Sequence, residues 1–490
     1  MILRSPCMAR RYRRLATACL GKYPRFDACR AGRGVTSLLL IALAAGVQAE
    51  DDQPWRLSSA LGLPSWLTVS GSHRTRYESL DGQFRAGGGG SNQLISLRTT
   101  LLVEAHAGWF RAGAELIDAR AFDADRDSFI GTGEVNAVEP VQAYIGTRFS
   151  DVFAAGDTFD NQIGRFTLDL GSRRLVGRNR FRNTTNAFDG LLSRWSGAGG
   201  RKLTAFYSLP LRRRPAGLEA LLDNEIKLDK ESFKQEFWGL HFATASLPAI
   251  PGSGELYLFG MNEKDGPRFN SRNRDIVTAG GRWTRAPQAG HLDFDHEGAY
   301  QFGDTRGGTN PVLTADLDVR SWFVHSEVGY QFDTKWRPRL RYEFDIASGD
   351  KDPTDGKFNR FDSLFGPRNS DFGPTGIFGP LSRSNLVSPG FRIEIKPTAR
   401  WDGFVSYRAV WLDEARDSFG ATGVVDRSGA AGRFAGHQVH GRLRFWLLPG
   451  NLRLNAGAAV LVDGSFLKRA PNATGEGDAV FGFFETEVFF

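Results

Sequence analysis

From residue 66 onward, apolar and polar residues alternate in short stretches that end in turn residues. In the stretch RPRLRYEFDIA (337–347), for example, Leu340 and Phe344 alternate with Arg341 and Glu343. Successive side chains of a strand point to opposite faces, so each stretch predicts a strand with one apolar and one polar face. A tilted strand of about 9–11 residues is long enough to cross a bilayer.

Eighteen such strands are predicted. They cover residues 66–78, 94–106, 109–119, 137–149, 160–169, 187–196, 201–209, 233–246, 254–262, 274–284, 291–302, 317–330, 337–347, 388–397, 402–412, 436–447, 451–461 and 479–490. The connections after odd-numbered strands hold 11 to 40 residues, whereas those after even-numbered strands hold 2 to 10. A soluble β-sandwich gives no reason for this alternation. We therefore predict an all-β fold, a transmembrane antiparallel β-barrel over residues 66–490, with long extracellular loops and short periplasmic turns.

The first 49 residues have a different character. A basic stretch with Arg25, Arg30 and Arg33 precedes the apolar run 34–49, which ends in small residues before Glu50. This order predicts a secretory signal peptide over residues 1–49, cleaved after Ala49, and a short periplasmic segment over residues 50–65. The alternative, a retained membrane anchor, needs roughly 20 apolar residues, and this run is shorter.

The basic balance of the chain belongs largely to this N-terminal region. The sequence has 62 Lys and Arg against 55 Asp and Glu, but residues 1–49 contain nine of the basic residues and one acid. The remainder is nearly neutral, so its charge gives no support to nucleic-acid binding. All three cysteines, Cys7, Cys19 and Cys29, also lie there, which leaves residues 50–490 without a disulfide framework or a cysteine metal site.

The last predicted strand alternates Phe484, Val488 and Phe490 with Glu485 and Glu487. An alternating strand that ends in an aromatic residue resembles the signal recognised by the barrel assembly machinery of Gram-negative bacteria. We therefore expect this chain in the outer membrane as a multi-pass barrel, in contact with lipid and lipopolysaccharide.

The polar faces of eighteen strands would line a lumen wide enough to hold water, as in porins. After residue 49 the chain has 43 arginines and 10 lysines, and the arginine side chain forms a rigid fork that binds carboxylates and phosphates. Alternation places these arginines on the lumen wall: Arg74, Arg76, Arg339, Arg341, Arg408, Arg442 and Arg444. Two interpretations stay open. The arginines bind an anionic solute, or they pair with inward acids such as Glu115, Glu343 and Asp345 and brace the wall.

The segment RFTLDLGSRRLVGRNRFR (165–182) favours anion selection, because Asp169 is its single acid among many arginines. If the segment folds inward, Arg165, Arg173, Arg174 and Arg178 would form a positive constriction. If it stays outside, it would be a surface patch that meets lipopolysaccharide phosphates.

Four stretches carry a resemblance to a known family. Residues 164–190, 347–366, 371–376 and 447–473 resemble the alginate-export porin family. The resemblance implies an eighteen-stranded outer-membrane barrel whose arginine-rich conduit passes an anionic uronate polysaccharide or oligosaccharide, with Arg165, Arg173, Arg174 and Arg178 as conduit residues. It also implies periplasmic export partners. The transported sugar and the direction of transport stay open, and a general or small-carboxylate-selective porin is the alternative.

Two further functions are weighed. Asp350, Asp352 and Asp355 in SGDKDPTDG (348–356) form a weak calcium candidate, but Asp, Pro and Gly are ordinary turn residues and the closing Glu of an EF-hand is missing. We therefore expect no cofactor.

An outer-membrane barrel enzyme is the alternative from a different functional class, and no G-x-S-x-G motif supports it. We predict that the chain is not an enzyme.

Overall fold

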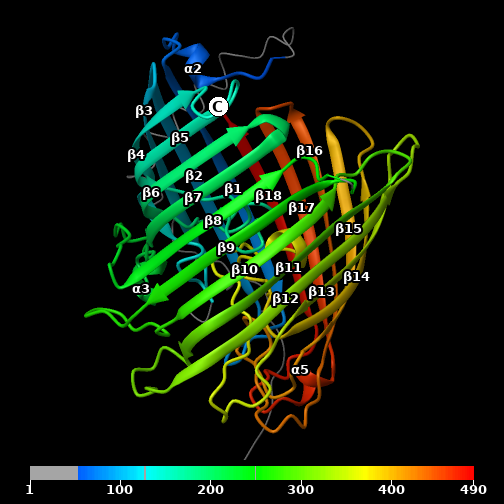
Figure 1. The fold of residues 1–490 in the computed structure, drawn as a ribbon. Helices are drawn as coiled ribbons and strands as arrows, with labels where there is room; N and C mark the ends of the chain where they lie inside the picture. The colour runs from blue at the N-terminus through cyan, green and yellow to red at the C-terminus, as the bar shows by residue number, and fades with distance from the viewer. Residues whose placement is uncertain (1–52, 126–128, 249) are drawn as a thin grey trace, which may run out of the picture. The chain divides into compact units, whose positions relative to one another are not determined.

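The computed structural model describes residues 53–125, 129–248 and 250–490. The predicted signal peptide lies outside these residues. From β1 to β18, each strand is hydrogen-bonded antiparallel to its neighbours in sequence, and β18 pairs back onto β1. This last pairing closes the sheet, so the described part of the chain from residue 54 onward forms an eighteen-stranded antiparallel β-barrel (Figure 1).

The strand bounds agree with the sequence prediction to within four residues at every end. The strands are β1 (Leu67–Asp81), β2 (Asn92–Ala107), β3 (Phe110–Phe122), β4 (Asn136–Ser150), β5 (Thr158–Phe166), β6 (Phe188–Gly197), β7 (Arg201–Pro210), β8 (Gln235–Thr244), β9 (Ser253–Glu263), β10 (Asp275–Arg285), β11 (Leu292–Arg306), β12 (Asp316–Gln331), β13 (Arg339–Ala347), β14 (Leu386–Ile395), β15 (Trp401–Trp411), β16 (Phe434–Leu448), β17 (Leu452–Asp463) and β18 (Ala479–Phe489). The alternation of long and short connections is confirmed with them.

The closing seam depends on a glycine. The backbone N–H of Phe490 donates to the Gly71 carbonyl at 3.0 Å, and the Gly71 N–H donates to the Phe490 carbonyl at 2.9 Å. A Cβ atom at Gly71 would lie 2.6 Å from the Phe490 ring and 2.3 Å from the Thr100 carbonyl oxygen. The terminal aromatic ring therefore packs over β1 only because residue 71 has no side chain.

The helical elements are short. They are α2 (Leu57–Ala60), the 3-10 turn η1 (Ala198–Gly200), α3 (Leu218–Leu222), α4 (Asn369–Phe372) and α5 (Ser465–Arg469). Among the described residues, none of the helices is long and apolar enough to cross a membrane.

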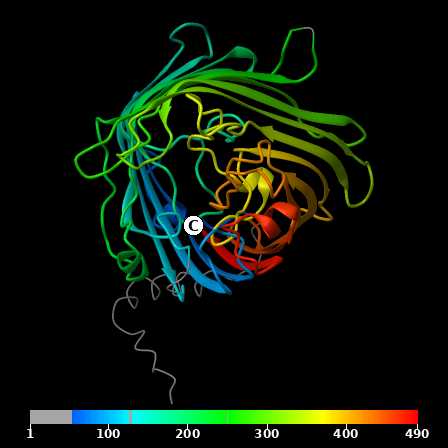
Figure 2. The same cartoon turned by 90° about the horizontal axis from the view of Figure 1, so that it is seen from below.

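Several long connections enter the barrel instead of standing away from it. Figure 2 looks along the barrel and shows the yellow and orange segments, from the connections that follow β13 and β15, inside the ring of strands. The connection 348–385 reaches the wall, because the Gln438 side chain on β16 donates to the Phe372 carbonyl at 2.8 Å. A bridge between Val176 and Phe365 joins this connection to the one that follows β5.

This arrangement places the apolar core inside the barrel. One cluster packs Leu80, Leu94 and Phe481 of the wall against Phe378 and Phe419 of the connections. A second packs Phe188, Phe237 and Phe259 of the wall against Val176 and Phe361. The expectation that the lumenal face is polar along its whole length is thus wrong at the long-connection end. Wall positions there are apolar because they face packed connections rather than water.

Candidate functional site

The connection after β5, residues 167–187, lies in the lumen against β1. Arg74 donates to the Arg180 carbonyl at 2.8 Å and to the Asn183 side-chain oxygen at 2.9 Å. Arg76 donates to the Phe181 carbonyl at 2.6 Å, and its guanidinium lies 3.9 Å from the centre of the Phe181 ring. Two lumenal arginines therefore hold this connection by its backbone.

The same connection reaches the opposite wall. Arg178 pairs with Glu115 of β3 at 2.7 Å, whereas Arg174 pairs with Glu297 of β11 at 2.8 Å and with Asp295 at 3.1 Å. Because β3 and β11 lie far apart in the ring of strands, the ion pairs fasten the connection across the lumen. Of the two placements that the sequence left open, the structure shows the inward one.

Arg174 is the centre of this attachment. It also pairs with Asp371 of the connection 348–385 at 3.1 Å, and Asp371 pairs in turn with Arg383. Burial by itself would lower the pKa of Arg174, but the Asp295 and Glu297 carboxylates outweigh burial and raise it above its ordinary value. Arg174 is therefore a fixed cation whose charge is already matched by the protein.

The predicted wall arginines are also matched by acids. The pairs are Arg74 with Glu485; Arg76 with Glu78 and Glu485; Arg339 with Asp293, Glu327 and Glu394; Arg341 with Glu327 and Glu343; Arg408 with Glu343 and Asp345; and Arg442 and Arg444 with Asp402. Arg74, Arg76 and Arg408 are almost fully buried. Their geometry fits the bracing interpretation.

The remaining predicted conduit residues show the same pattern. The prediction that Arg165 lines the conduit is wrong. Its neighbour Phe166 packs in the lumenal core and its cross-strand partner Ala143 is exposed on the outer wall, so Arg165 lies on the outward face of β5, where it pairs with Glu139 at 2.7 Å and Asp189 at 2.8 Å. Arg173 pairs with Asp169, four residues earlier, at 3.0 Å. Each of the eleven arginines proposed from the sequence thus has a carboxylate partner, and the excess positive charge lies elsewhere.

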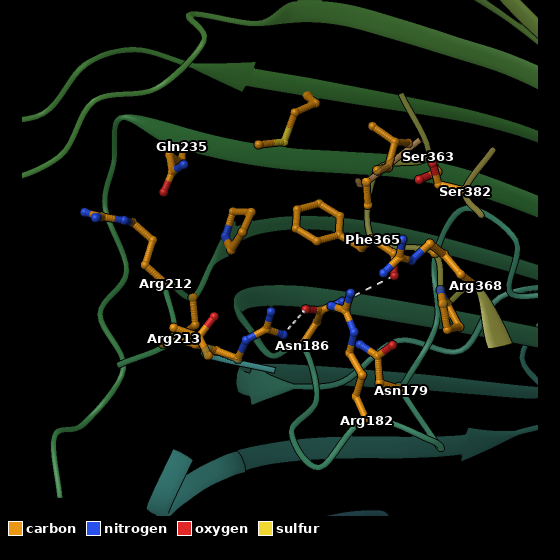
Figure 3. Close-up of a pocket in the computed structure, with 18 of the residues that line it drawn as sticks. Asn179, Arg182, Asn186, Arg212, Arg213, Gln235, Ser363, Phe365, Arg368 and Ser382 are labelled. Atoms are coloured by element: carbon orange, nitrogen blue, oxygen red, sulfur yellow. Dashed lines mark hydrogen bonds between the residues drawn. The ribbon is translucent and has the colours of Figure 1, made fainter. Parts of the chain in front are cut away.

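That excess lies around a cavity of about 500 Å³ at the long-connection end (Figure 3). Four half-buried arginines line it: Arg182 from the connection after β5, Arg212 and Arg213 from the connection after β7, and Arg368 from the connection after β13. In the described part of the chain, none of the four has a carboxylate within 4.0 Å. Asn179, Asn186, Gln235 and Ser363 add neutral polar groups to the lining. We call this cavity the arginine pocket.

The side-chain hydrogen bonds of Arg213 and Arg368 end on neutral groups, and the carboxylates of Glu134 and Asp229 offset the positive charge of Arg213 only in part. Arg213 donates to the Asn186 side-chain oxygen at 2.7 Å, Arg368 donates to the Gly379 carbonyl at 3.2 Å, and Arg212 stacks 3.9 Å from the Phe269 ring centre. Burial and the neighbouring Arg182 lower the pKa of Arg213 to about 10. Burial, Arg182 and Arg85 lower the pKa of Arg368 to about 9. A carboxylate bound here would relieve this repulsion.

Sequence analysis missed most of the arginine pocket. Arg182 ends the segment that was singled out, but Arg212, Arg213 and Arg368 were not proposed. The run RRR at 212–214, which is followed by Pro215 and has no acid beside it, was a usable signal. Nothing local marks Arg368, because it reaches the pocket only through the folding of a long connection.

The calcium candidates do not form one site. Asp352 accepts a hydrogen bond from the hydroxyl of Thr354, and Asp355 accepts one from the backbone of Lys357, as in ordinary turns. Asp350 is buried, and its N–H donates to Asp417. Across residues 53–125, 129–248 and 250–490 there is no group of three or more His, Cys, Asp or Glu that could hold a metal ion.

A closed eighteen-stranded barrel with long connections folded into a charged lumen defines the class of outer-membrane porins. The family model described as "Alginate export" matches residues 65–481, and the chain belongs to this family. The resemblance found in the sequence is thereby confirmed. A search of curated proteins finds no match.

Solved structures share the fold at low identity. OccAB2 of Acinetobacter baumannii is 14% identical, with a TM-score of 0.55 over 86% of this chain and 98% of the other. OccK2 (OpdF) of Pseudomonas aeruginosa, solved in complex with glucuronate, is 11% identical, with a TM-score of 0.53 over 86% and 96%. OccD3 (OpdP) of the same species is 11% identical, with a TM-score of 0.52 over 87% and 91%. These similarities show the fold alone. Family and fold both point to a channel.

Proposed function

We propose that this porin passes anionic uronate saccharides and that the arginine pocket is the site where it selects them. The observation that carries the proposal is the group formed by Arg182, Arg212, Arg213 and Arg368, which lacks carboxylate partners among the described residues. A paired arginine presents little net charge to a passing solute. Four unpaired ones in a partly enclosed site attract anions, as rings of Arg or Lys do in anion pores.

The arginine side chain also suits the chemistry of a uronate. Its planar fork donates two parallel hydrogen bonds to one carboxylate, and this geometry is specific as well as strong. The neutral groups of Asn179, Asn186 and Gln235 could then receive sugar hydroxyls. The family supports an acidic polysaccharide, and the glucuronate bound by the structurally similar OccK2 supports the idea that a barrel of this fold admits a uronate.

A second candidate is a porin for small carboxylates. Two observations favour it: Arg174 and Arg178 fasten a connection across the lumen, and the arginine pocket of about 500 Å³ lies in the size range of single small-molecule sites. The two candidates share the same anion chemistry and differ in the length of saccharide that can pass.

Planar-bilayer recording tests both. The open channel should prefer anions, and oligouronates added to one side should block the current while neutral oligosaccharides of equal length should not. Replacing all four pocket arginines by Gln should abolish the preference and the block. A variant that keeps wild-type selectivity and block would refute the pocket as the selecting site. A length series decides between the candidates, because a polysaccharide conduit passes long chains that a small-carboxylate porin excludes.

A further inference from the structure

The arginine pocket has an apolar side as well as a charged one. Its apolar lining includes Pro210, Leu211, Met261, Leu364 and Phe365. Figure 3 shows the Phe365 ring among the pocket side chains, with Arg212 to one side of it and Arg368 to the other. A bare carboxylate would use only the charged side, so the apolar side suits a ligand that has an apolar surface of its own.

The backbone of Phe365 is held from two directions. Its N–H donates to the Leu175 carbonyl at 2.9 Å, and its carbonyl accepts a hydrogen bond from the Asn186 side chain at 3.2 Å. Leu364, directly before it, has a φ of 49°, a left-handed conformation that is unfavourable for a residue with a bulky side chain. Such a conformation persists only where the surrounding contacts fix it. Phe365 therefore occupies a defined position in the pocket.

The Phe365 ring is supported by other rings, but no flat group is stacked on it. It meets Phe188 edge-to-face with ring centres 5.1 Å apart, and it meets Phe237 at a tilt of 58° with centres 4.8 Å apart. Among the residues that the structure describes, no aromatic ring lies parallel to it and no arginine lies over it; Arg212 stacks on Phe269 instead. The half-buried ring is thus a rigid apolar surface in a cavity lined by cations.

A pyranose ring that carries a carboxylate matches both sides of this pocket. The oxygen atoms of a sugar polarise its C–H bonds, so one face of the ring is apolar and weakly positive, whereas the face of an aromatic ring is weakly negative. The carboxylate of a uronate projects from the edge of the sugar ring. A sugar ring that lies on Phe365 therefore directs its carboxylate toward the surrounding arginines. An open-chain acid has the carboxylate but no flat face.

We propose that Phe365 is a stacking platform for the sugar ring and makes the arginine pocket specific for uronates over open-chain carboxylates. This role rests on the proposed function, because the arginines must bind the carboxylate while the sugar ring lies on Phe365. It favours the saccharide channel over the porin for small carboxylates.

Glucuronate and gluconate test the proposal, because both are six-carbon hydroxy acids with one carboxylate and only glucuronate forms a pyranose ring. Saturation-transfer NMR on the purified barrel in detergent measures the affinity for each acid and identifies the C–H groups that contact aromatic side chains. The unsubstituted barrel should bind glucuronate more tightly than gluconate and should transfer saturation most strongly to the C–H groups of the sugar ring. Phe365→Leu should weaken glucuronate binding roughly 3- to 10-fold and change gluconate binding less than about twofold. Phe365→Tyr, which keeps the ring, should retain the preference.

Phe361→Leu is the matched control. Phe361 belongs to the same apolar cluster and the same connection but does not line the pocket, so its replacement should leave the preference for glucuronate unchanged. Heat-modifiable migration shows that each variant has assembled.

Three results would overturn the proposal: an unchanged preference in Phe365→Leu, equal weakening of both acids in that variant, or an equal loss of preference in Phe361→Leu. The last two would mean that Phe365 only packs the connection. The saturation pattern of the unsubstituted barrel decides without any variant, because weak transfer to the ring C–H groups would also refute stacking. If neither acid binds the unsubstituted barrel, the arginine pocket itself fails as the selecting site, and the role of Phe365 fails with it.

Discussion

Replacing Arg182 by Gln tests the arginine pocket with little disturbance of the fold. The reason is that the Arg182 side chain donates no hydrogen bond to another described residue. Two unit charges about 5 Å apart attract by about 3 kcal/mol at an effective dielectric constant of 20. Arg182 is half-buried, so solvent and salt reduce this value to about 1–2 kcal/mol. The variant should therefore weaken block by a short oligouronate roughly 5- to 30-fold.

The assay is the concentration of oligouronate that halves the single-channel current at fixed voltage and about 0.1 M salt. Arg148→Gln is the matched control: Arg148 is a lumenal arginine paired with Asp160 at 3.0 Å, and its removal leaves Asp160 paired with Arg111. We expect less than a twofold change from it. Arg182→Lys, which keeps the charge but lacks the fork, should retain anion preference and weaken the block only in part. Equal effects of Arg182→Gln and Arg148→Gln would refute the reasoning, because charge anywhere in the lumen would then suffice.

Four other outcomes are expected. Arg174→Gln removes the ion-pair partner of buried Glu297, at a cost of about 3–5 kcal/mol, and should give noisier single-channel currents; quiet wild-type recordings would show that other contacts hold the connection. Burial raises the pKa of Asp229, in the connection after β7, to about 6; as pH falls from 7.5 to 5 this carboxylate loses its charge, so anion preference should rise, and Asp229→Asn should show the low-pH preference throughout. Deleting Phe490 should lower the amount of heat-modifiable barrel, and normal amounts would count against a C-terminal assembly signal. Tags inserted at Gly88 should be labelled on intact cells and tags at Gly199 should not; the reverse pattern would invert the topology.

The sequence predicted the barrel because strand alternation is local. Whether Leu340 and Arg341 face opposite sides depends only on their adjacency along one strand. A closed sheet then needs nothing more than strands of similar length joined in order. The long and short connections distinguished the two ends of the barrel. The same local rule correctly placed Arg74, Arg339 and Arg408 on the lumenal face.

The pairing of those arginines could not be deduced in this way. Arg174 meets Glu297 and Asp371 only when two connections fold inward and touch the far wall. The Phe378 and Phe419 side chains, which pack these connections against the wall, lie outside every predicted strand. Sequence reasoning therefore overestimated the free charge of the wall, because it counted arginines without their partners.

What the sequence determined by itself is the fold class, the strand order and the face on which most wall residues lie, since these follow from period-two alternation and chain connectivity; Arg165 near the end of β5 is an exception. What only the tertiary structure decided is which positive charges remain uncompensated. Arg182, Arg213 and Arg368 come from three connections far apart in the chain and share one cavity after the connections pack inside the barrel. Net charge at a site is a property of spatial neighbours, and loop packing chooses those neighbours through contacts that no local pattern encodes.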